Sequence, residues 1–182
     1  MRPGLAAEPQ PRSMKEEAAR HAARLVHQCR VAALGTLQDG VPAISQVPFA
    51  LLPGAHCAFV ILVSRLAAHT RAIQEDPRVG FMIAQPENDH TVAHALARVS
   101  VRAEARMIPR SHPDHAGARA VYAARFPDQE FLFDLGDFEL FALAPQTVRV
   151  VAGFAQAASV TPAALARAVG DGSSAASGSQ PL

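Results

Sequence analysis

The chain has 182 residues, which is enough for one well-packed domain and too few for two comfortable ones. Hydrophobic residues make up 49% of it and charged residues 18%, a composition that excludes a solvated, disordered chain. Its 17 basic and 16 acidic side chains leave a formal charge of +1, so the overall charge favours neither nucleic acid nor an anionic membrane as a partner.

The N-terminal residues and the cysteines support further expectations. Residues 1–12 contain three prolines and no apolar run, so we expect a flexible arm that is not a signal peptide. The apolar runs elsewhere are far shorter than the roughly 20 residues that span a membrane. Cys29 and Cys57 are the only cysteines, and their spacing predicts incidental or buried thiols without a metal site. We therefore expect a cytoplasmic protein with no membrane contact.

The first elements predict a helix followed by an antiparallel meander. Ser13 and Glu16 have the spacing of a capping box, and apolar residues then recur at helical spacing to about residue 30. Three strands follow at residues 31–37, 41–52 and 57–63, and they are joined by tight turns at 38–40 and 53–54. This order is typical of a barrel or a sandwich.

The remaining elements alternate between helices and strands. Ser64 is the predicted N-cap of a helix that Pro77 ends, with Leu66 and Ile73 on one face. Thr161 and Pro162 open a short terminal helix, after which residues 170–182 are predicted to be disordered. The other predicted elements are strands at 79–84 and 95–108, a helix at 109–126, and a hairpin formed by strands 138–143 and 147–154.

The junction between the third strand and the second helix carries the clearest chemical signal. Ser64 and Arg65 stand where a strand ends and a helix begins, and His69 and Thr70 follow about one turn later. Free amides at a helix N-terminus and a guanidinium both attract anions, so this junction is a candidate phosphate site. The alternative is an ordinary capped helix with solvated arginines.

Several motifs, taken in order, resemble the pyridoxamine-5′-phosphate-oxidase-like split-barrel flavoproteins, and most of all their haem-iron-utilisation branch. The resemblance covers residues 14–158 and implies an antiparallel split β-barrel with flanking helices, mainly β in class, that binds FMN. It implies a domain at residues 13–158, between the N-terminal arm (1–12) and a short helix with a tail (159–182). The matching segments are residues 34–42, 45–50, 64–71, 76–79, 136–138 and 151–154.

The resemblance also implies which residues bind the cofactor. Ser64, Arg65, His69 and Thr70 would surround the FMN phosphate. The second predicted strand would run along the flavin ring, and a late Gly-Phe pair would lie near the flavin of a partner subunit. Those further residues are Ser45, Gln46, Val47, Gly153 and Phe154. From the residues alone, Gln46 is equally well explained as a solvent-facing strand residue. An aromatic residue that ends a strand, as Phe154 does, is more often part of the core.

Two departures from the family pattern bear on activity. Arg149 is followed by two valines where the true oxidases carry an Arg-x-His motif, which argues against oxidation of pyridoxamine phosphate. The resemblance places the iron-ligating histidine of haem-binding members in a C-terminal segment, whereas the last of the eight histidines here is His115.

We therefore expect an FMN-binding homodimer that acts as an oxidoreductase on a small-molecule redox substrate, with the flavin carrying the chemistry. The first alternative is a haem-binding or haem-degrading protein of haem-iron utilisation. The second alternative is a flavin-binding dimer without catalytic activity. The sequence assigns no catalytic residue.

Overall fold

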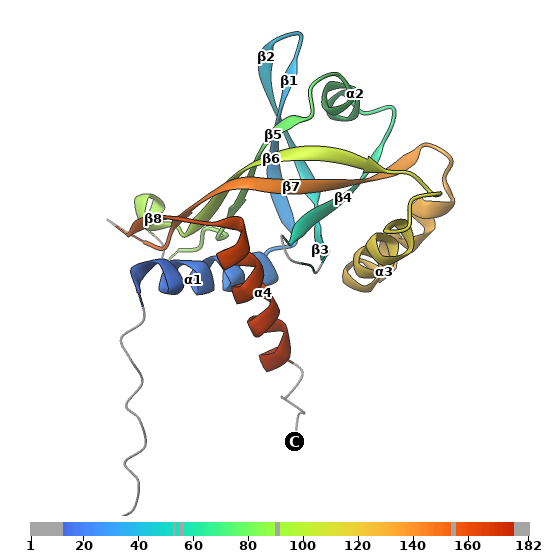
Figure 1. The fold of residues 1–182 in the computed structure, drawn as a ribbon. Helices are drawn as coiled ribbons and strands as arrows, with labels where there is room; N and C mark the ends of the chain where they lie inside the picture. Colours follow the sequence, from blue (N-terminus) through green and yellow to red (C-terminus); the bar gives the residue numbers. More distant parts are fainter. Residues whose placement is uncertain (1–12, 53, 55–56, 90–91, 154–155, 177–182) are drawn as a thin grey trace, which may run out of the picture.

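The computed structural model describes residues 13–52, 54, 57–89, 92–153 and 156–176 of the chain. Helices and strands alternate through these residues (Figure 1). The helices are α1 (Met14–Gln28), α2 (Ala68–Glu75), α3 (His115–Arg125) and α4 (Pro162–Ala176), together with the 3-10 helices η1 (Ala93–Ala95) and η2 (Pro127–Asp134). The strands are β1 (Val31–Gln38), β2 (Val41–Pro48), β3 (Ala50–Leu52), β4 (Ala58–Ser64), β5 (Arg78–Ala84), β6 (Arg98–Ile108), β7 (Phe138–Val151) and β8 (Ala157–Val160).

The strands form one antiparallel sheet that curls into an open barrel. The strand order is β2-β1-β5-β6-β7-β4-β3, and β8 pairs with β7. The outermost strands, β2 and β3, are joined in sequence by Phe49 alone, so the two ends of the sheet must lie close together at that point. No strand pairing joins β2 to β3 within the described residues, and the barrel is therefore not closed. The predicted mainly β, antiparallel barrel with flanking helices is confirmed in this open form.

The main core fills the inside of this sheet. Phe49, Phe59 and Phe81 pack ring against ring at its centre, with centroids 5.0–5.9 Å apart. Helices α1 and α4 lie side by side beneath the sheet (Figure 1). The buried face of α1 and residues Leu165 and Val169 of α4 belong to the same core. Burial of each large apolar side chain contributes about 1.5–3 kcal/mol, so both helices stabilise the barrel.

A second, smaller core lies on the outer side of β4 and β7. Tyr122 of α3, Phe126 directly after this helix and Phe133 of η2 pack there against Val60 and Leu62 of β4. Figure 1 shows α3 against the end of the sheet that also carries β3 and β4. This core fixes α3 and η2 beside the start of β7.

The first half of the chain follows the predicted elements closely. The capping box of α1 is confirmed, because Ser13 Oγ accepts a bond from the Glu16 N–H and the Glu16 carboxylate accepts one from the Ser13 N–H. The predicted strand at 41–52 is split at Phe49 into β2 and β3. Ser64 is not the N-cap of α2; it is the last residue of β4, and α2 begins four residues later. Leu66 is exposed and does not share the buried face of Ile73.

The C-terminal part differs more. The predicted hairpin at 138–154 is wrong, because β7 runs as one strand from Phe138 to Val151 with a bulge opposite Arg102 and Ala103. The predicted disorder from residue 170 is contradicted by α4, which continues to Ala176. The domain limits remain a prediction, and β8 crosses the limit at residue 158. No helix in the described part of the chain combines the length and apolar character needed to cross a membrane.

Candidate functional site

The junction after β4 is built around the side chain of Ser64. Its hydroxyl donates a 2.6 Å hydrogen bond to the Asp137 carboxylate and accepts one from the Leu66 N–H at 3.1 Å. The Ser64 backbone pairs with Phe138, the first residue of β7, so Asp137 arrives beside the junction from 73 positions later in the chain. The backbone N–H of Arg65 also donates to the Asp137 carbonyl at 2.7 Å. These bonds fasten the turn before α2 to the start of β7.

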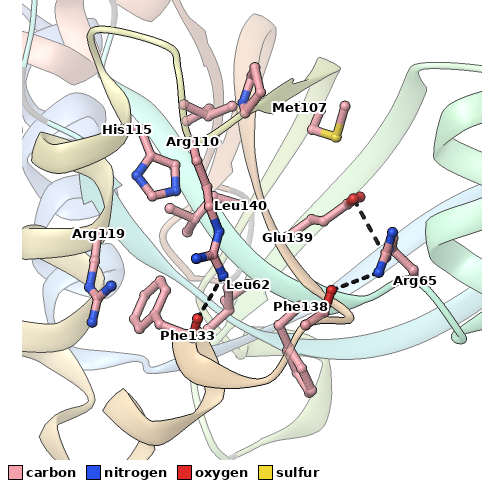
Figure 2. A pocket seen from close by; sticks show the side chains of 13 residues that line it. Leu62, Arg65, Met107, Arg110, His115, Arg119, Phe133, Phe138, Glu139 and Leu140 are labelled. Carbon is pink, nitrogen blue, oxygen red and sulfur yellow. Dashed lines mark hydrogen bonds and ion pairs between the residues drawn. The ribbon is translucent and has the colours of Figure 1, made fainter.

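Arg65 extends from this turn along the start of β7. Its guanidinium donates to the Gly136 carbonyl at 2.6 Å, and its Nε lies 3.7 Å from a Glu139 carboxylate oxygen (Figure 2). The side chain is 54% exposed, so the ion pair is screened by solvent and contributes little to stability. The second Glu139 oxygen is buried and has no hydrogen-bond partner among the described residues. Arg65 is therefore held by acceptors of its own chain.

Thr70 does not face an open site. Its side chain is fully buried, and its hydroxyl donates a 2.7 Å hydrogen bond to the Ser64 carbonyl. This bond fixes α2 against the end of β4. The predicted contact of Thr70 with a phosphate would require that bond to break.

His69 and Ser45 come together from α2 and β2. The His69 Nδ1 lies 3.2 Å from the Ser45 hydroxyl oxygen. The other ring nitrogen, Nε2, is buried and has no hydrogen-bond partner within the described residues. Burial lowers the pKa of His69, so the imidazole is neutral near pH 7. These two predicted cofactor-binding residues make a side-chain contact that joins β2 to α2.

The rest of the predicted set is spread over the fold. Gln46 is exposed, whereas the Val47 side chain is 3% exposed and belongs to the main core, as the alternation of a strand requires. Gly153 follows the end of β7, at the opposite end of that strand from Ser64. Strand β7 is on the order of 45 Å long at about 3.3 Å per residue, so a single chain does not bring these segments together. Phe154 lies outside the described residues.

The junction, in this arrangement, does not fit a phosphate well. The hydroxyls of Ser64 and Thr70 and the guanidinium of Arg65 already bond to acceptors of the chain. Two carboxylates, Asp137 and Glu139, lie within reach of those donors and would repel a dianion. The sequence reasoning missed both carboxylates as site residues, although the segment 136–138 is part of the motif set that carries the resemblance.

Comparison with known proteins shows the family to which this chain belongs. The family model for pyridoxamine 5′-phosphate oxidase matches residues 18–152. A chloroplast haem oxygenase, HOZ, from Arabidopsis thaliana is 33% identical over 119 residues, which are 65% of this chain and 34% of that protein. The haem oxygenase HutZ from Vibrio cholerae is 30% identical over 124 residues, which are 68% of this chain and 69% of HutZ.

Solved structures agree with the sequence relatives. A haem-binding protein from Mycobacterium smegmatis matches with a TM-score of 0.73 and 30% identity, over 89% of this chain and 62% of that one. The chain thus spans about a third of the plant relative and somewhat under two thirds of the mycobacterial structure. The resemblance drawn from the motifs is confirmed: the chain belongs to the pyridoxamine 5′-phosphate oxidase family.

Proposed function

We propose that this chain is a haem-binding protein of haem-iron utilisation. The relatives at 30–33% identity are named haem oxygenases, and a structure at 30% identity is named a haem-binding protein. Because the chain spans only part of some of these relatives, their whole activity is not carried over. Haem, which was the first alternative to FMN in the sequence analysis, becomes the primary assignment.

The observation that carries this proposal is the environment of His69. A histidine that ligates haem iron is neutral, offers one ring nitrogen to the metal and has the other held by a hydrogen bond. The lowered pKa of His69 keeps its ring neutral, and Ser45 lies within hydrogen-bond distance of Nδ1. With the proton on Nδ1, Nε2 keeps a lone pair that no described group uses. A C-terminal histidine is not needed as ligand.

The fit to haem has one structural requirement. Protein atoms enclose Nε2 in the single chain, so coordination requires a shift of the short helix α2 or of the side chains around it. When bound, haem iron supplies electron transfer and oxygen chemistry. The chain itself supplies the ring orientation through Ser45 and a buried setting that disfavours protonation of His69.

FMN remains the second candidate, because the motifs of this chain resemble those of a flavoprotein family. The occupied donors at Ser64, Arg65 and Thr70, with two carboxylates beside them, argue against a tight phosphate site. An FMN complex would require those bonds to be exchanged for bonds to the phosphate. A small-molecule redox partner and a cytoplasmic location remain expectations within either assignment.

The proposal includes a homodimer formed by the outer face of the sheet. Ile44 is 74% exposed and Met82 41% exposed on β2 and β5. Both line an open hollow of about 850 Å³ that continues over β6 and β7 to β8. Large apolar side chains gathered on one face mark an interaction surface. The predicted contact of Gly153 with the site of a partner subunit stays part of this proposal, because a single chain keeps Gly153 at the opposite end of β7 from Ser64.

A haem titration of the purified full-length chain tests the proposal. We expect saturable binding at one haem per chain and the Soret spectrum of a histidine-ligated iron. We expect His69→Ala to lose that spectrum, while His94→Ala, which changes an exposed histidine of η1, keeps it. Addition of a reductant in air then distinguishes haem degradation from haem binding alone, because degradation removes the Soret band and releases iron. Absence of saturable haem binding would refute the assignment.

A further inference from the structure

A cavity lies between the start of β7 and the helix α3, and it shares Arg65, Gly136 and Glu139 with the junction after β4. It has a volume of about 260 Å³, and Figure 2 shows the side chains around it. Its walls combine polar and apolar side chains, and the apolar part is formed by Leu62, Ile108, Phe133, Phe138 and Leu140 among others. The volume is slightly below the usual 300–1,000 Å³ of drug-sized ligand sites, so it suits a compact ligand.

Three basic side chains gather on one side of this cavity. Arg110, His115 and Arg119 lie around the Phe133 ring in Figure 2. Arg110 donates to the Phe133 carbonyl at 2.9 Å, and the Arg119 guanidinium stacks over the Phe133 ring at 4.7 Å from its centroid. These contacts place both guanidinium groups at the cavity wall, and a guanidinium has five N–H donors, so each keeps donors beyond the contact it makes.

The charges of the cavity are only partly balanced. Arg65 is paired with Glu139, and Arg119 lies 3.9 Å from a solvent-exposed Glu130 carboxylate. Arg110 forms no ion pair with a described carboxylate. Burial lowers the pKa of His115, and the nearby Arg110 and Arg119 lower it further, which indicates that positive charge dominates this side of the cavity.

The start of α3 adds to this positive environment. The helix has eleven residues and begins at His115. Asp114 at its N-cap makes no side-chain capping bond, so the first-turn amides are not neutralised by that carboxylate. The basic side chains and the helix start therefore act on the same side of the cavity.

We propose that this cavity binds the carboxylate of a compact apolar acid. One guanidinium without an ion pair matches a single negative charge, and the planar fork of Arg110 suits a carboxylate. The apolar body of the ligand packs against Leu62, Phe133 and Leu140. The inference does not rest on haem binding, because it uses α3 and η2 and makes no use of His69 or Ser45. The carboxylate has two possible sources, a separate small acid or the carboxylate side chains of haem.

Benzoate is the probe, and the full-length chain is titrated with it by calorimetry. We expect saturable binding that is weakened about 10- to 100-fold in Arg110→Gln and several-fold in Arg119→Gln. Arg106→Gln, which changes an exposed arginine of β6 outside the cavity, should bind benzoate like the wild type. Benzyl alcohol, which has the same ring without the charge, should bind at least 10-fold more weakly than benzoate.

The ring of His115 gives a readout that a merely structural role of the arginines would not move. Benzoate should raise the pKa of His115, because its negative charge offsets part of the repulsion from Arg110 and Arg119. The pH dependence of the His115 NMR signals measures this pKa. This measurement on wild-type protein keeps the proposal testable even if Arg110→Gln does not fold. An unchanged His115 pKa at saturating benzoate would overturn the proposal.

Two further arms decide between general anion binding and the two carboxylate sources. Inorganic phosphate that binds as tightly as benzoate would overturn the proposal, because the apolar wall would then contribute nothing. Benzoate that binds equally well to haem-loaded protein identifies a separate acid as the ligand. Benzoate displaced by haem, with haem affinity also reduced by Arg110→Gln, identifies a carboxylate of haem as the group bound. Either of the last two results supports the cavity as a carboxylate site.

Discussion

The His69 Nδ1 lies 3.2 Å from the Ser45 hydroxyl oxygen, and this contact joins α2 to β2. The two residues are 24 positions apart, and the contact joins a helix between β4 and β5 to the outermost strand β2. The contact leaves Nε2 as a buried nitrogen without a described partner. An unpaired buried polar atom costs free energy, so its persistence is consistent with a role in ligand binding.

Ser45→Ala should weaken haem binding without abolishing it. The hydroxyl orients the ring, and loss of one hydrogen bond of about 0.5–1.5 kcal/mol lowers affinity roughly 2- to 13-fold. Ser45→Thr keeps a hydroxyl and should recover part of the loss. Ser111→Ala, on an exposed turn, is the matched control. Haem titrations followed in the Soret band give the four affinities, and equal affinity for Ser45→Ala and wild type would remove Ser45 from the account.

The stability of the fold should fall as the pH drops below about 6.5. Burial lowers the pKa of His69 in the folded state, so the unfolded chain takes up a proton first as the pH falls. The contribution of His69 is fully present above pH 6.5 and is lost as the pH falls toward the lowered folded pKa. Urea denaturation from pH 8 to pH 5 measures this slope, which His69→Asn should flatten.

His21→Asn provides the comparison for that experiment. Its pKa is also lowered, by burial and by Arg24, but it lies on α1 and contacts no candidate site residue by any described bond. Each substitution should therefore remove its own part of the pH dependence of stability, and the two effects should add. A slope that His69→Asn leaves unchanged would contradict a neutral, buried His69.

Arg125→Met should destabilise the fold by about 2–3 kcal/mol. The Arg125 guanidinium donates to the carbonyls of Val26, His27 and Cys29, where α1 ends, and stacks on the Phe49 ring. Methionine keeps an apolar stem but leaves those carbonyls without their donor. Arg106→Met, at an exposed position of β6, should change stability by less than about 0.5 kcal/mol. The free energies of unfolding in urea decide between a structural role for Arg125 and none.

Ile44→Lys together with Met82→Lys should convert a dimer to monomers. Two buried ammonium groups at an apolar interface are strongly unfavourable, since each would lose its hydration. Met14→Lys changes an exposed apolar residue at the start of α1 and should leave the assembly intact. Light scattering at micromolar protein concentration measures the mass of the assembly directly. A wild-type chain that is monomeric while it binds haem would refute the proposed interface.

The sequence predicted those helices and strands well whose limits are set by bonds between residues close together in the chain. The capping box at Ser13 and the alternation along β6 are such cases, because each depends on residues within a few positions. The predicted break between two strands at Pro145 is absent, and the reason lies in the strand pairing around this residue. Between its pairings with β4 and β8, strand β7 is free on one edge, and there a proline costs no ladder bond while a bulge takes up the extra residue.

The candidate site was predicted in part. The sequence located the segment 64–70 and residue Ser45, and the structure joins Ser45 to His69. The acceptors that occupy Ser64 and Arg65 come from residues 136–139, and no spacing rule links segments about 70 positions apart. The sequence does not link His115 to the cavity either, because Phe133 meets it only through the packing of α3 and η2.

The most direct test of the central claim is a paired titration of the apoprotein with haem and with FMN in one buffer. We expect saturation at one haem per chain with a histidine-ligated Soret spectrum that is lost in His69→Ala, and FMN binding at least 10-fold weaker than haem binding. Tight, stoichiometric FMN binding, together with haem binding that does not saturate, would contradict it.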